Sequence, residues 1–393
     1  MYILATVLFS TFYFILIMRV TRHAYVLALT FSVVLGAIFE LTLSMIVLAK
    51  ILTYALVLVL DFTVFGTPRI RRDTVIKNGL LMAAALVGVV PGTLVSLSQS
   101  VDLGNYVVAY FLAFSPLFGY LIGSSVPSQN QSRTGSVSIL ILTFPIYLLV
   151  ARGIFLGLDR LVFGSIAVGG LYGHLLFVIL LADHFNMKYR SFGLLMSIFD
   201  VLYGGSRRYL VAIFMPAIVV RFIGSGDGRG VSGRNLLLRL VAIGTIISLV
   251  LLFLVAFSDG SAKIELRGVG YRTAQNQIFI SKMSSIFVMA FGVGAGFTEV
   301  VQYSWVWFSD FGPRLHSYFY SIIMNFGLWG IALCVVPYVV ALFQFRGRGN
   351  EIFFWFGIGW LISAQFDTPP DGLWVIGWAA GVSEKRWRNF VRR

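Results

Sequence analysis

Residues 316–343 read HSYFYSIIMNFGLWGIALCVVPYVVALF and contain no acidic residue, lysine or arginine. A membrane-spanning helix needs about 20 mainly apolar residues, so this stretch is long enough to cross a bilayer. A second block, residues 236–257, is interrupted only by the charge of Arg239. Strands of a membrane barrel alternate apolar and polar residues over about ten positions. Unbroken blocks of this length therefore predict helices.

The whole chain has the same character as these blocks. It has 393 residues, of which 58% are hydrophobic and 12% charged, and its mean hydropathy is +0.89. A soluble domain carries about 45–50% apolar and about 25% charged residues. The polar side chains are too few to cover a water-facing globule, so the sequence predicts an integral membrane protein and excludes a single-span or peripheral one.

The apolar pattern predicts an all-α polytopic bundle of about 12–13 transmembrane helices. We divide it into N-terminal transmembrane helices over 1–190, a central region over 191–345 with an outer loop at 258–315, and C-terminal helices with a basic cytoplasmic tail over 346–393. The expected helices cover residues 2–18, 24–39, 42–60, 79–96, 105–123, 136–151, 161–182, 191–204, 207–223, 236–257, 316–344, 351–365 and 370–381.

The basic residues predict the orientation of these helices. The net charge of +14 comes from 30 Lys+Arg against 16 Asp+Glu, and cytoplasmic loops of membrane proteins are enriched in Lys and Arg. With the N-terminus outside and the C-terminus inside, most basic residues fall on the inner side, so the charge requires no nucleic-acid partner. The orientation does not explain the basic residues on the predicted outer side, which are therefore candidates for a functional role. They are Arg152, Arg160, Arg207, Arg208, Lys263, Arg267, Arg272, Lys282 and Arg314.

Metal and disulfide chemistry find little support in the sequence. The single cysteine, Cys334, lies in an apolar run and excludes an intramolecular disulfide and a cysteine-based metal site. None of the four histidines pairs with another at the four-residue spacing of metal ligands on a helix. We therefore expect no metal and no cofactor.

The outer loop 258–315 is the longest connection, and long loops in compact chains are usually functional. Its apolar middle, residues 286–301, is expected to lie at the membrane interface or dip into the membrane without spanning it. On the same side, Ser206, Arg207 and Arg208 open a helix after a tight turn. Two adjacent guanidinium groups there either anchor the helix among lipid headgroups or recognise phosphate, for which their geometry is suited.

The order of features in residues 194–336 resembles the O-antigen polymerase and O-antigen ligase superfamily of bacterial envelope glycan assembly. A Ser-Arg pair at 206–207 is followed by Arg272, by the glycine-rich turn 292–296 and by His316-Ser317 at the mouth of a helix with the pair Gly327 and Gly330. The family often has Asn after the His and Trp after the loop Arg. Here Ser317 follows the His, and residues 273–277 contain no aromatic side chain.

The resemblance implies a membrane-embedded glycosyltransferase with a GT-C-like architecture and an outward-facing active site in the bacterial inner membrane. It would transfer a glycan from an undecaprenyl-pyrophosphate carrier to a sugar hydroxyl, without metal or nucleotide sugar. The lipid-linked oligosaccharide and membrane lipid are its implied partners, and a chain-length regulator is a further candidate. The region 191–345 would then be the polymerase/ligase-like core.

The residues suit this chemistry. A departing pyrophosphate develops negative charge, which Arg207, Arg208 and Arg272 are placed to stabilise. His316 is the predicted catalytic base, because an imidazole with its ordinary pKa near ~6.5 takes up a proton near neutral pH. Glycines at 292–296 would let the backbone approach a ligand or pack helices closely. Candidate substrate-binding residues are Ser206, Gly294, Gly296, Trp305 and Arg314.

Three activities remain open at this point. A polymerase passes the growing chain to a new lipid-linked repeat unit, whereas a ligase passes the finished chain to lipid A-core, and both need the same donor site. We favour the polymerase, because the outer loop is rather short and polymerases serve many envelope polymers. A transporter or flippase of lipid-linked oligosaccharide is the alternative from another class, although such proteins often have internal repeats and none is visible here.

Overall fold

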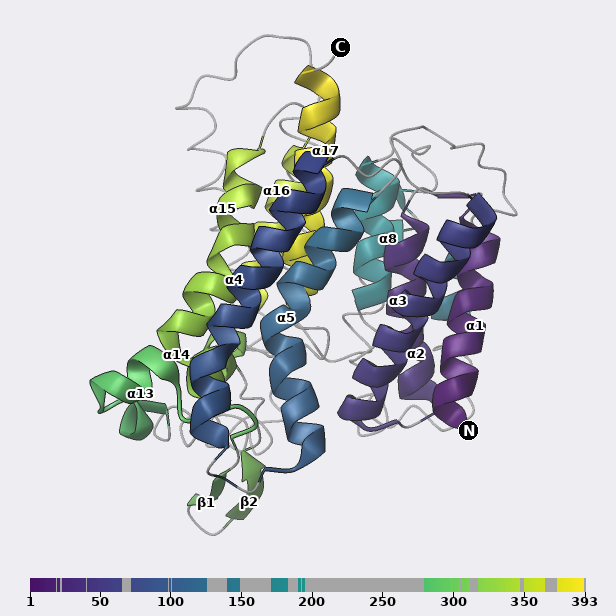
Figure 1. Ribbon diagram of the computed structural model, residues 1–393. Coiled ribbons are helices and arrows are strands. Elements are labelled where there is room, and N and C mark those ends of the chain that lie inside the picture. Colours follow the sequence, from purple (N-terminus) through teal and green to yellow (C-terminus); the bar gives the residue numbers. More distant parts are fainter. Residues whose placement is uncertain are drawn as a thin grey trace, which may run out of the picture.

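The computed structural model describes residues 1–65, 72–125, 140–148, 171–182, 190–194, 279–311, 317–346, 350–364 and 373–391, apart from residues 19, 22, 40, 98, 100, 192, 298, 304 and 305. Most of this part of the chain is helical, with one antiparallel hairpin (Figure 1). The elements are α1 (Tyr2–Ile17), α2 (Ala24–Ile38), α3 (Leu43–Phe65), α4 (Arg72–Ser96), α5 (Leu103–Ser125), α8 (Leu171–Ala182), α13 (Ile286–Phe291), β1 (Glu299–Tyr303), β2 (Val306–Phe311), α14 (Tyr318–Cys334), α15 (Val336–Gln344), α16 (Glu351–Ser363) and α17 (Trp374–Val391).

The helical prediction holds for the described residues. Three segments are long and apolar enough to cross a membrane, namely Ile76–Ser96, Leu103–Ser125 and Tyr318–Gln344. Shorter apolar helices accompany them, and residues 140–148 form a helical segment inside the predicted helix 136–151. The helices predicted at 207–223 and 236–257, and most of the one at 191–204, lie outside the described residues.

Several elements differ from the sequence prediction. Helix α4 begins at Arg72, ahead of the predicted start at 79, and the predicted helix 316–344 is divided into α14 and α15. Helix α17 runs to Val391, well beyond the predicted end at 381, because Glu384 bonds Arg388 one turn later. The predicted outer loop contains a β-hairpin, in which β1 and β2 pair antiparallel with an irregularity between Glu299 and Val301. The six-residue helix α13 precedes this hairpin, so the apolar segment 286–301 forms no spanning helix, as expected.

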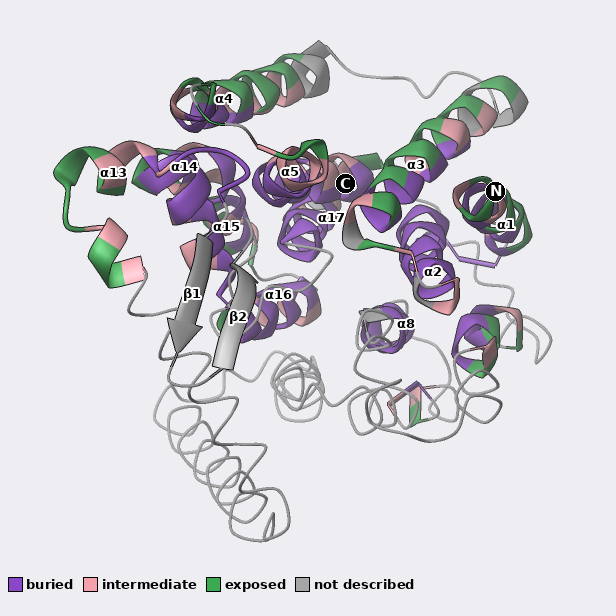
Figure 2. Cartoon of the chain, turned by 90° about the horizontal axis from the view of Figure 1, so that it is seen from below, coloured by how far each residue is buried: buried purple, intermediate pink, exposed green. Residues whose placement is uncertain are grey.

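The two ends of the bundle carry different features. The hairpin and α13 lie at the same end as the N-terminus, and the C-terminus lies at the opposite end (Figure 1). We call these the N-terminal end and the C-terminal end of the bundle. Viewed along the bundle, α5 and α17 are central and largely buried, whereas α4 exposes an outward face (Figure 2).

Helices α5 and α17 make the closest helix contact in the described bundle. Each carries two glycines four residues apart, Gly119 and Gly123 on α5 and Gly377 and Gly381 on α17. A Cβ atom on any of the four would overlap the backbone of the other helix. Small residues at this spacing let membrane helices approach closely enough for extensive van der Waals contact.

Prolines inside α4 and α5 each free a backbone carbonyl, and each of these carbonyls accepts a hydrogen bond from a side chain of α14. Proline has no N–H, so Pro91 leaves the carbonyl of Val87 without its helical donor, and the Trp329 indole N–H donates to that oxygen at 3.2 Å. Pro116 likewise releases the carbonyl of Leu112, which accepts from the Tyr318 hydroxyl at 2.5 Å. In an apolar medium no water can bond these two free carbonyls, so a neighbouring helix must supply the donors, and here that helix is α14.

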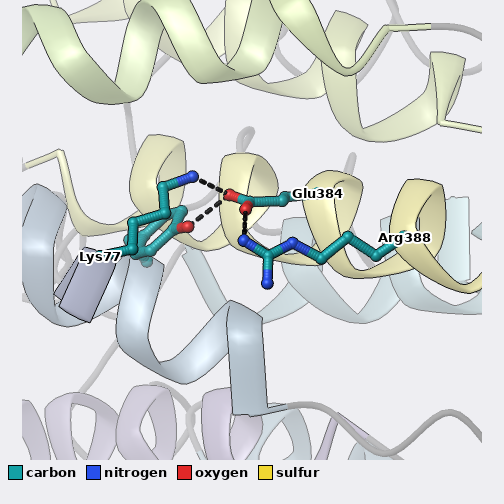
Figure 3. A network of polar contacts seen from close by, with 4 residues as sticks. Lys77, Glu384 and Arg388 are labelled. Atoms are coloured by element: carbon teal, nitrogen blue, oxygen red, sulfur yellow. Dashed lines mark hydrogen bonds and ion pairs between the residues drawn. The ribbon is translucent and has the colours of Figure 1, made fainter. Parts of the chain in front are cut away.

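A buried carboxylate ties α17 to α4 and α5 at the C-terminal end. The Glu384 side chain is 5% exposed, and its oxygens lie 2.5 Å from Lys77 Nζ and from Arg388 Nη2 (Figure 3). The Tyr120 hydroxyl also donates to Glu384. Burial raises the pKa of Glu384, but the bonds from Lys77 and Tyr120 and the charges of Lys77 and Arg388 outweigh it and lower the pKa overall.

Substituting Glu384→Gln is expected to lower the free energy of unfolding by about 1–3 kcal/mol. A fully buried pair costs about 3–5 kcal/mol to break, but Lys77 and Arg388 are each 35% exposed, so water screens part of the loss. Thermal melting of the detergent-solubilised protein measures the effect. Glu351→Gln is the matched control, because Glu351 makes no ion pair with a described residue, and its melting temperature should stay near wild type.

The same group predicts a pH dependence. Because the folded pKa of Glu384 is below its ordinary value of 4.5, its contribution is fully present above that value and is lost as the pH falls through the folded pKa. Wild-type melting temperature should therefore drop in acid more steeply than that of Glu384→Gln. Parallel curves for the two proteins would contradict this assignment.

Candidate functional site

Most of the predicted site residues cannot be placed. Ser206, Arg207, Arg208, Arg272, Trp305, Arg314 and His316 lie outside the described residues. The structure does describe the glycine-rich turn at 292–296, the helix that begins directly after His316, and the hairpin. These parts define the candidate site at the N-terminal end of the bundle.

The glycine-rich turn is folded into the bundle, between α4 and α14. The Val293 N–H donates to the Met324 carbonyl at 2.7 Å, and the Ala295 N–H donates to the Gly92 carbonyl at 2.9 Å. On the other side of the turn, Gln99 Nε2 donates to the Val293 carbonyl at 3.2 Å. Backbone groups of the turn are thus bonded to two neighbouring helices, which fixes its position.

Helix α14 is interrupted where this turn contacts it. Gly327 has φ +68° and ψ −172°, a conformation that breaks the helix and that side-chain-bearing residues rarely adopt. A Cβ atom there would overlap the carbonyl of Ala290 in α13, and one on Gly92 would overlap the carbonyl of Asn325. Glycine is therefore required on both helices that enclose the turn.

Three glycines of the turn have positive φ, namely Gly292 at 87°, Gly294 at 131° and Gly296 at 78°. Gly292 lies so close to α14 that a Cβ would come within 2.7 Å of Phe326 N. The sequence left ligand approach and helix packing as equal readings of this motif. The described contacts show that these glycines are needed for packing, and the approach of a ligand to the turn stays a prediction.

Asn325 holds the turn from inside α14 and was missed by the sequence reasoning. Its side chain is buried, its Oδ1 accepts from the Gly296 N–H at 2.8 Å, and its Nδ2 donates to the Ser321 carbonyl at 2.7 Å. A single amide side chain within an apolar span was the available signal, because a polar group at such depth needs defined partners.

Polar side chains gather around the turn. The hydroxyls of Thr93 and Tyr110 lie 2.6 Å apart, and the Tyr106 hydroxyl donates to the Ser96 carbonyl at 3.2 Å. The Tyr106 and Tyr110 rings are stacked, with centroids 6.2 Å apart. This end of α4 and α5 is therefore more polar than the apolar faces farther along the bundle.

The start of α14 is anchored at its first residues. Ser317 is buried, and its hydroxyl caps the helix by accepting from the Tyr320 N–H at 3.5 Å. The Tyr318 N–H donates to the carbonyl of Ala364 at the end of α16, at 3.0 Å. The first residues of α14 are thus held by a cap and by a bond to α16.

One buried cation lies away from this region. Lys50 of α3 is 7% exposed, and its Nζ lies 4.6 Å from the Trp374 ring and 5.6 Å from the Phe111 ring. Lys50 and Glu40 are the only charged residues in the apolar stretch 24–60, so the sequence predicts that they either pair inside the bundle or mark a displaced loop. Glu40 lies outside the described residues, but Lys50 itself is inside a helix and contacts two aromatic faces, which stabilises its charge.

Metal ligands do not cluster in the described part of the chain, where no group of three or more His, Cys, Asp or Glu residues could hold an ion. Cys334 is a buried free thiol there. The described residues therefore offer backbone, amide and hydroxyl groups to a ligand.

Comparisons with protein-family models, with curated proteins and with solved structures give no match to this chain. Its activity must consequently be argued from its own residues and geometry.

Proposed function

We propose that this chain is a polysaccharide polymerase, a membrane glycosyltransferase of the GT-C type. It would transfer an undecaprenyl-pyrophosphate-linked glycan to a sugar hydroxyl of a lipid-linked repeat unit. The proposal builds on the mostly helical architecture of the described residues, in which three helices are long and apolar enough to cross a membrane. It places the active site on the outer face of the bacterial inner membrane and the C-terminus in the cytoplasm.

The observation that carries the proposal is the docking of the glycine-rich turn onto α14. Two of the four sequence features behind the resemblance, the turn at 292–296 and the glycine-containing helix after His316, are bonded together through Val293, Gly296 and Asn325. The β-hairpin separates the turn from α14 in the sequence, and nothing in hydropathy alone requires their contact. A shared site would explain why these two features, separated along the chain, are packed against each other.

In the proposed reaction, the acceptor sugar hydroxyl attacks the anomeric carbon of the donor glycan. The bond from that carbon to the pyrophosphate oxygen breaks, and the bonding electron pair leaves with the lipid pyrophosphate. His316 takes the hydroxyl proton, while Arg207, Arg208 and Arg272 stabilise the charge on the departing phosphate oxygens. Ser206, Trp305 and Arg314 are the proposed substrate contacts. The hydrogen bond from Gly296 to Asn325 and the tight turn closed by the Gly294 carbonyl and the Phe297 N–H keep the nearby backbone in place.

The charge distribution supports the proposed sidedness. The buried cluster of Lys77, Glu384 and Arg388 lies in the C-terminal half of the bundle, where cytoplasmic loops would carry their basic residues. The hairpin and the glycine-rich turn lie toward the other end (Figure 1). An outward site near the turn and an inward basic tail are consistent with one membrane orientation.

Reconstitution tests the proposal directly. The purified full chain in lipid nanodiscs should convert a lipid-pyrophosphate-linked repeat unit into lipids carrying two or more repeats, and release lipid pyrophosphate. Extension should persist in the presence of a chelator. Transfer only to added lipid A-core would instead identify a ligase, and absence of transfer to both acceptors by well-folded protein would refute glycosyl transfer.

A transporter of lipid-linked oligosaccharide remains the second candidate because α14 is discontinuous at Gly327. Interrupted helices form substrate and ion sites in many transporters, where unwound carbonyls face the cavity. Here the Met324 carbonyl next to the break already accepts from Val293. Movement of a labelled lipid-linked oligosaccharide across vesicles without chain extension would favour the transporter.

A further inference from the structure

The outward face of α15 has an uninterrupted apolar surface. Val336, Val340 and Phe343 are 43%, 56% and 46% exposed, and their spacing of four and three residues places them on one side of the helix. Helix α15 continues the segment Tyr318–Gln344, which is long and apolar enough to cross a membrane. In such a segment, exposed side chains of this kind face hydrocarbon.

A groove runs along this face and ends at a cation. It has a volume of about 530 Å³ and is lined by Val339, Val340, Phe343, Gln344 and Arg346. Arg346 follows the last turn of α15 and is exposed. Within the described part of the chain, its guanidinium makes no hydrogen bond or ion pair.

The surroundings of Arg346 carry a surplus of positive charge. The neighbouring Phe345 ring lies 5.7 Å from Lys77 Nζ. Lys77 shares the single carboxylate of Glu384 with Arg388, so these three side chains together keep a net positive charge (Figure 3). Arg346 adds a further positive charge. Glu351 begins α16 next to Asn350, whose side chain donates to the Phe345 carbonyl, and the Glu351 carboxylate offsets one of these charges but leaves the sum positive.

We propose that this groove binds a phospholipid with an anionic headgroup. One acyl chain would lie along Val336, Val340 and Phe343, and the headgroup phosphate would accept the paired N–H groups of Arg346. A guanidinium matches phosphate oxygens in a two-point geometry, and basic pockets between membrane helices bind anionic headgroups. The positive surplus favours an anionic lipid over a zwitterionic one. The inference does not depend on the proposed transferase activity.

Native mass spectrometry of the purified full chain tests the site. The protein is titrated with phosphatidylglycerol and, separately, with phosphatidylethanolamine of the same acyl chains. Phosphatidylglycerol should bind more tightly, and Arg346→Gln should weaken it roughly fivefold, the factor expected for one cation near an anionic membrane surface. Lys282→Gln, the same charge change at the opposite end of the bundle, is the matched control and should leave the affinity unchanged.

Two further variants test the acyl-chain contact and the headgroup contact separately. Val340→Trp should fill the groove and weaken phosphatidylglycerol binding while every charge is kept, and Arg346→Lys should retain part of the affinity. Equal affinities for the two lipids, or equal losses from Arg346→Gln and Lys282→Gln, would overturn the proposal. So would cross-linking at residue 340 that captures a second copy of the chain in place of lipid.

Discussion

Substituting Gly327→Ala should destabilise the protein by about 2–6 kcal/mol, the sum of a left-handed backbone forced on a non-glycine residue and the overpacking of a filled contact. Gly327 has φ +68°, and a Cβ there would overlap the backbone carbonyl of Ala290. Because the obstacle is backbone, no rotamer change relieves it. Helix α14 or the glycine-rich turn must move, and the bond from Val293 to Met324 is lost with either movement.

Thermal unfolding of the detergent-solubilised protein, followed by tryptophan fluorescence and size-exclusion chromatography, measures this effect. The matched control is Gly79→Ala in α4, where an added Cβ meets nothing within 4 Å. That substitution should leave the protein unchanged or stabilise it by up to about 1 kcal/mol, because alanine favours helix over glycine. Equal melting temperatures for Gly327→Ala and wild type would show that the helix break is dispensable.

His316→Ala should reduce chain extension by about 10²–10⁴-fold, the usual contribution of a general base. The measured quantity is the rate of repeat-unit addition by the purified full chain, at lipid-linked substrate concentrations that saturate the wild type. The loss of activity on removing the general base should lower kcat more than it changes KM, because the proton transfer occurs after substrate binding. The melting temperature should stay close to wild type if the residue acts in the reaction.

His184→Ala provides the control, because residue 184 lies between the expected helices 161–182 and 191–204, on the predicted cytoplasmic side and opposite to His316. It should extend chains at the wild-type rate. Full activity of His316→Ala would refute the general-base role while leaving the transferase proposal to the reconstitution assay. A folded wild type with no extension would refute the transferase itself.

Hydropathy predicted most of the described helices, because they are apolar runs, but it did not predict the polar ends of α4 and α17 or the short helix α13. It could not predict where those runs break or bend. The break at Gly327 depends on a contact with Ala290, and the roles of Pro91 and Pro116 depend on donors from α14. The local spacing of Glu384 and Arg388 fits the extension of α17 to Val391, but hydropathy does not reveal the second partner of Glu384, Lys77 on α4.

The candidate site was predicted less completely. The glycine-rich turn was singled out from its composition, and its positive φ angles agree with that choice. Its partners were not foreseen, because Asn325 and Gly92 become neighbours of the turn only when α4 and α14 pack. The arginines and His316 were chosen for their chemistry and sidedness, and those roles stay predictions for the variants above to test.

The glycine contact between α5 and α17 also constrains how the chain is made. Gly119 and Gly377 face each other but are synthesised far apart in time. At about 5–20 residues per second, α5 is in the bilayer for roughly 10–50 seconds before α17 is complete. Every nascent chain therefore passes through an intermediate whose central helix has not yet met its partner. If translation stops before residue 377, α17 is never made and α5 permanently lacks its packing partner.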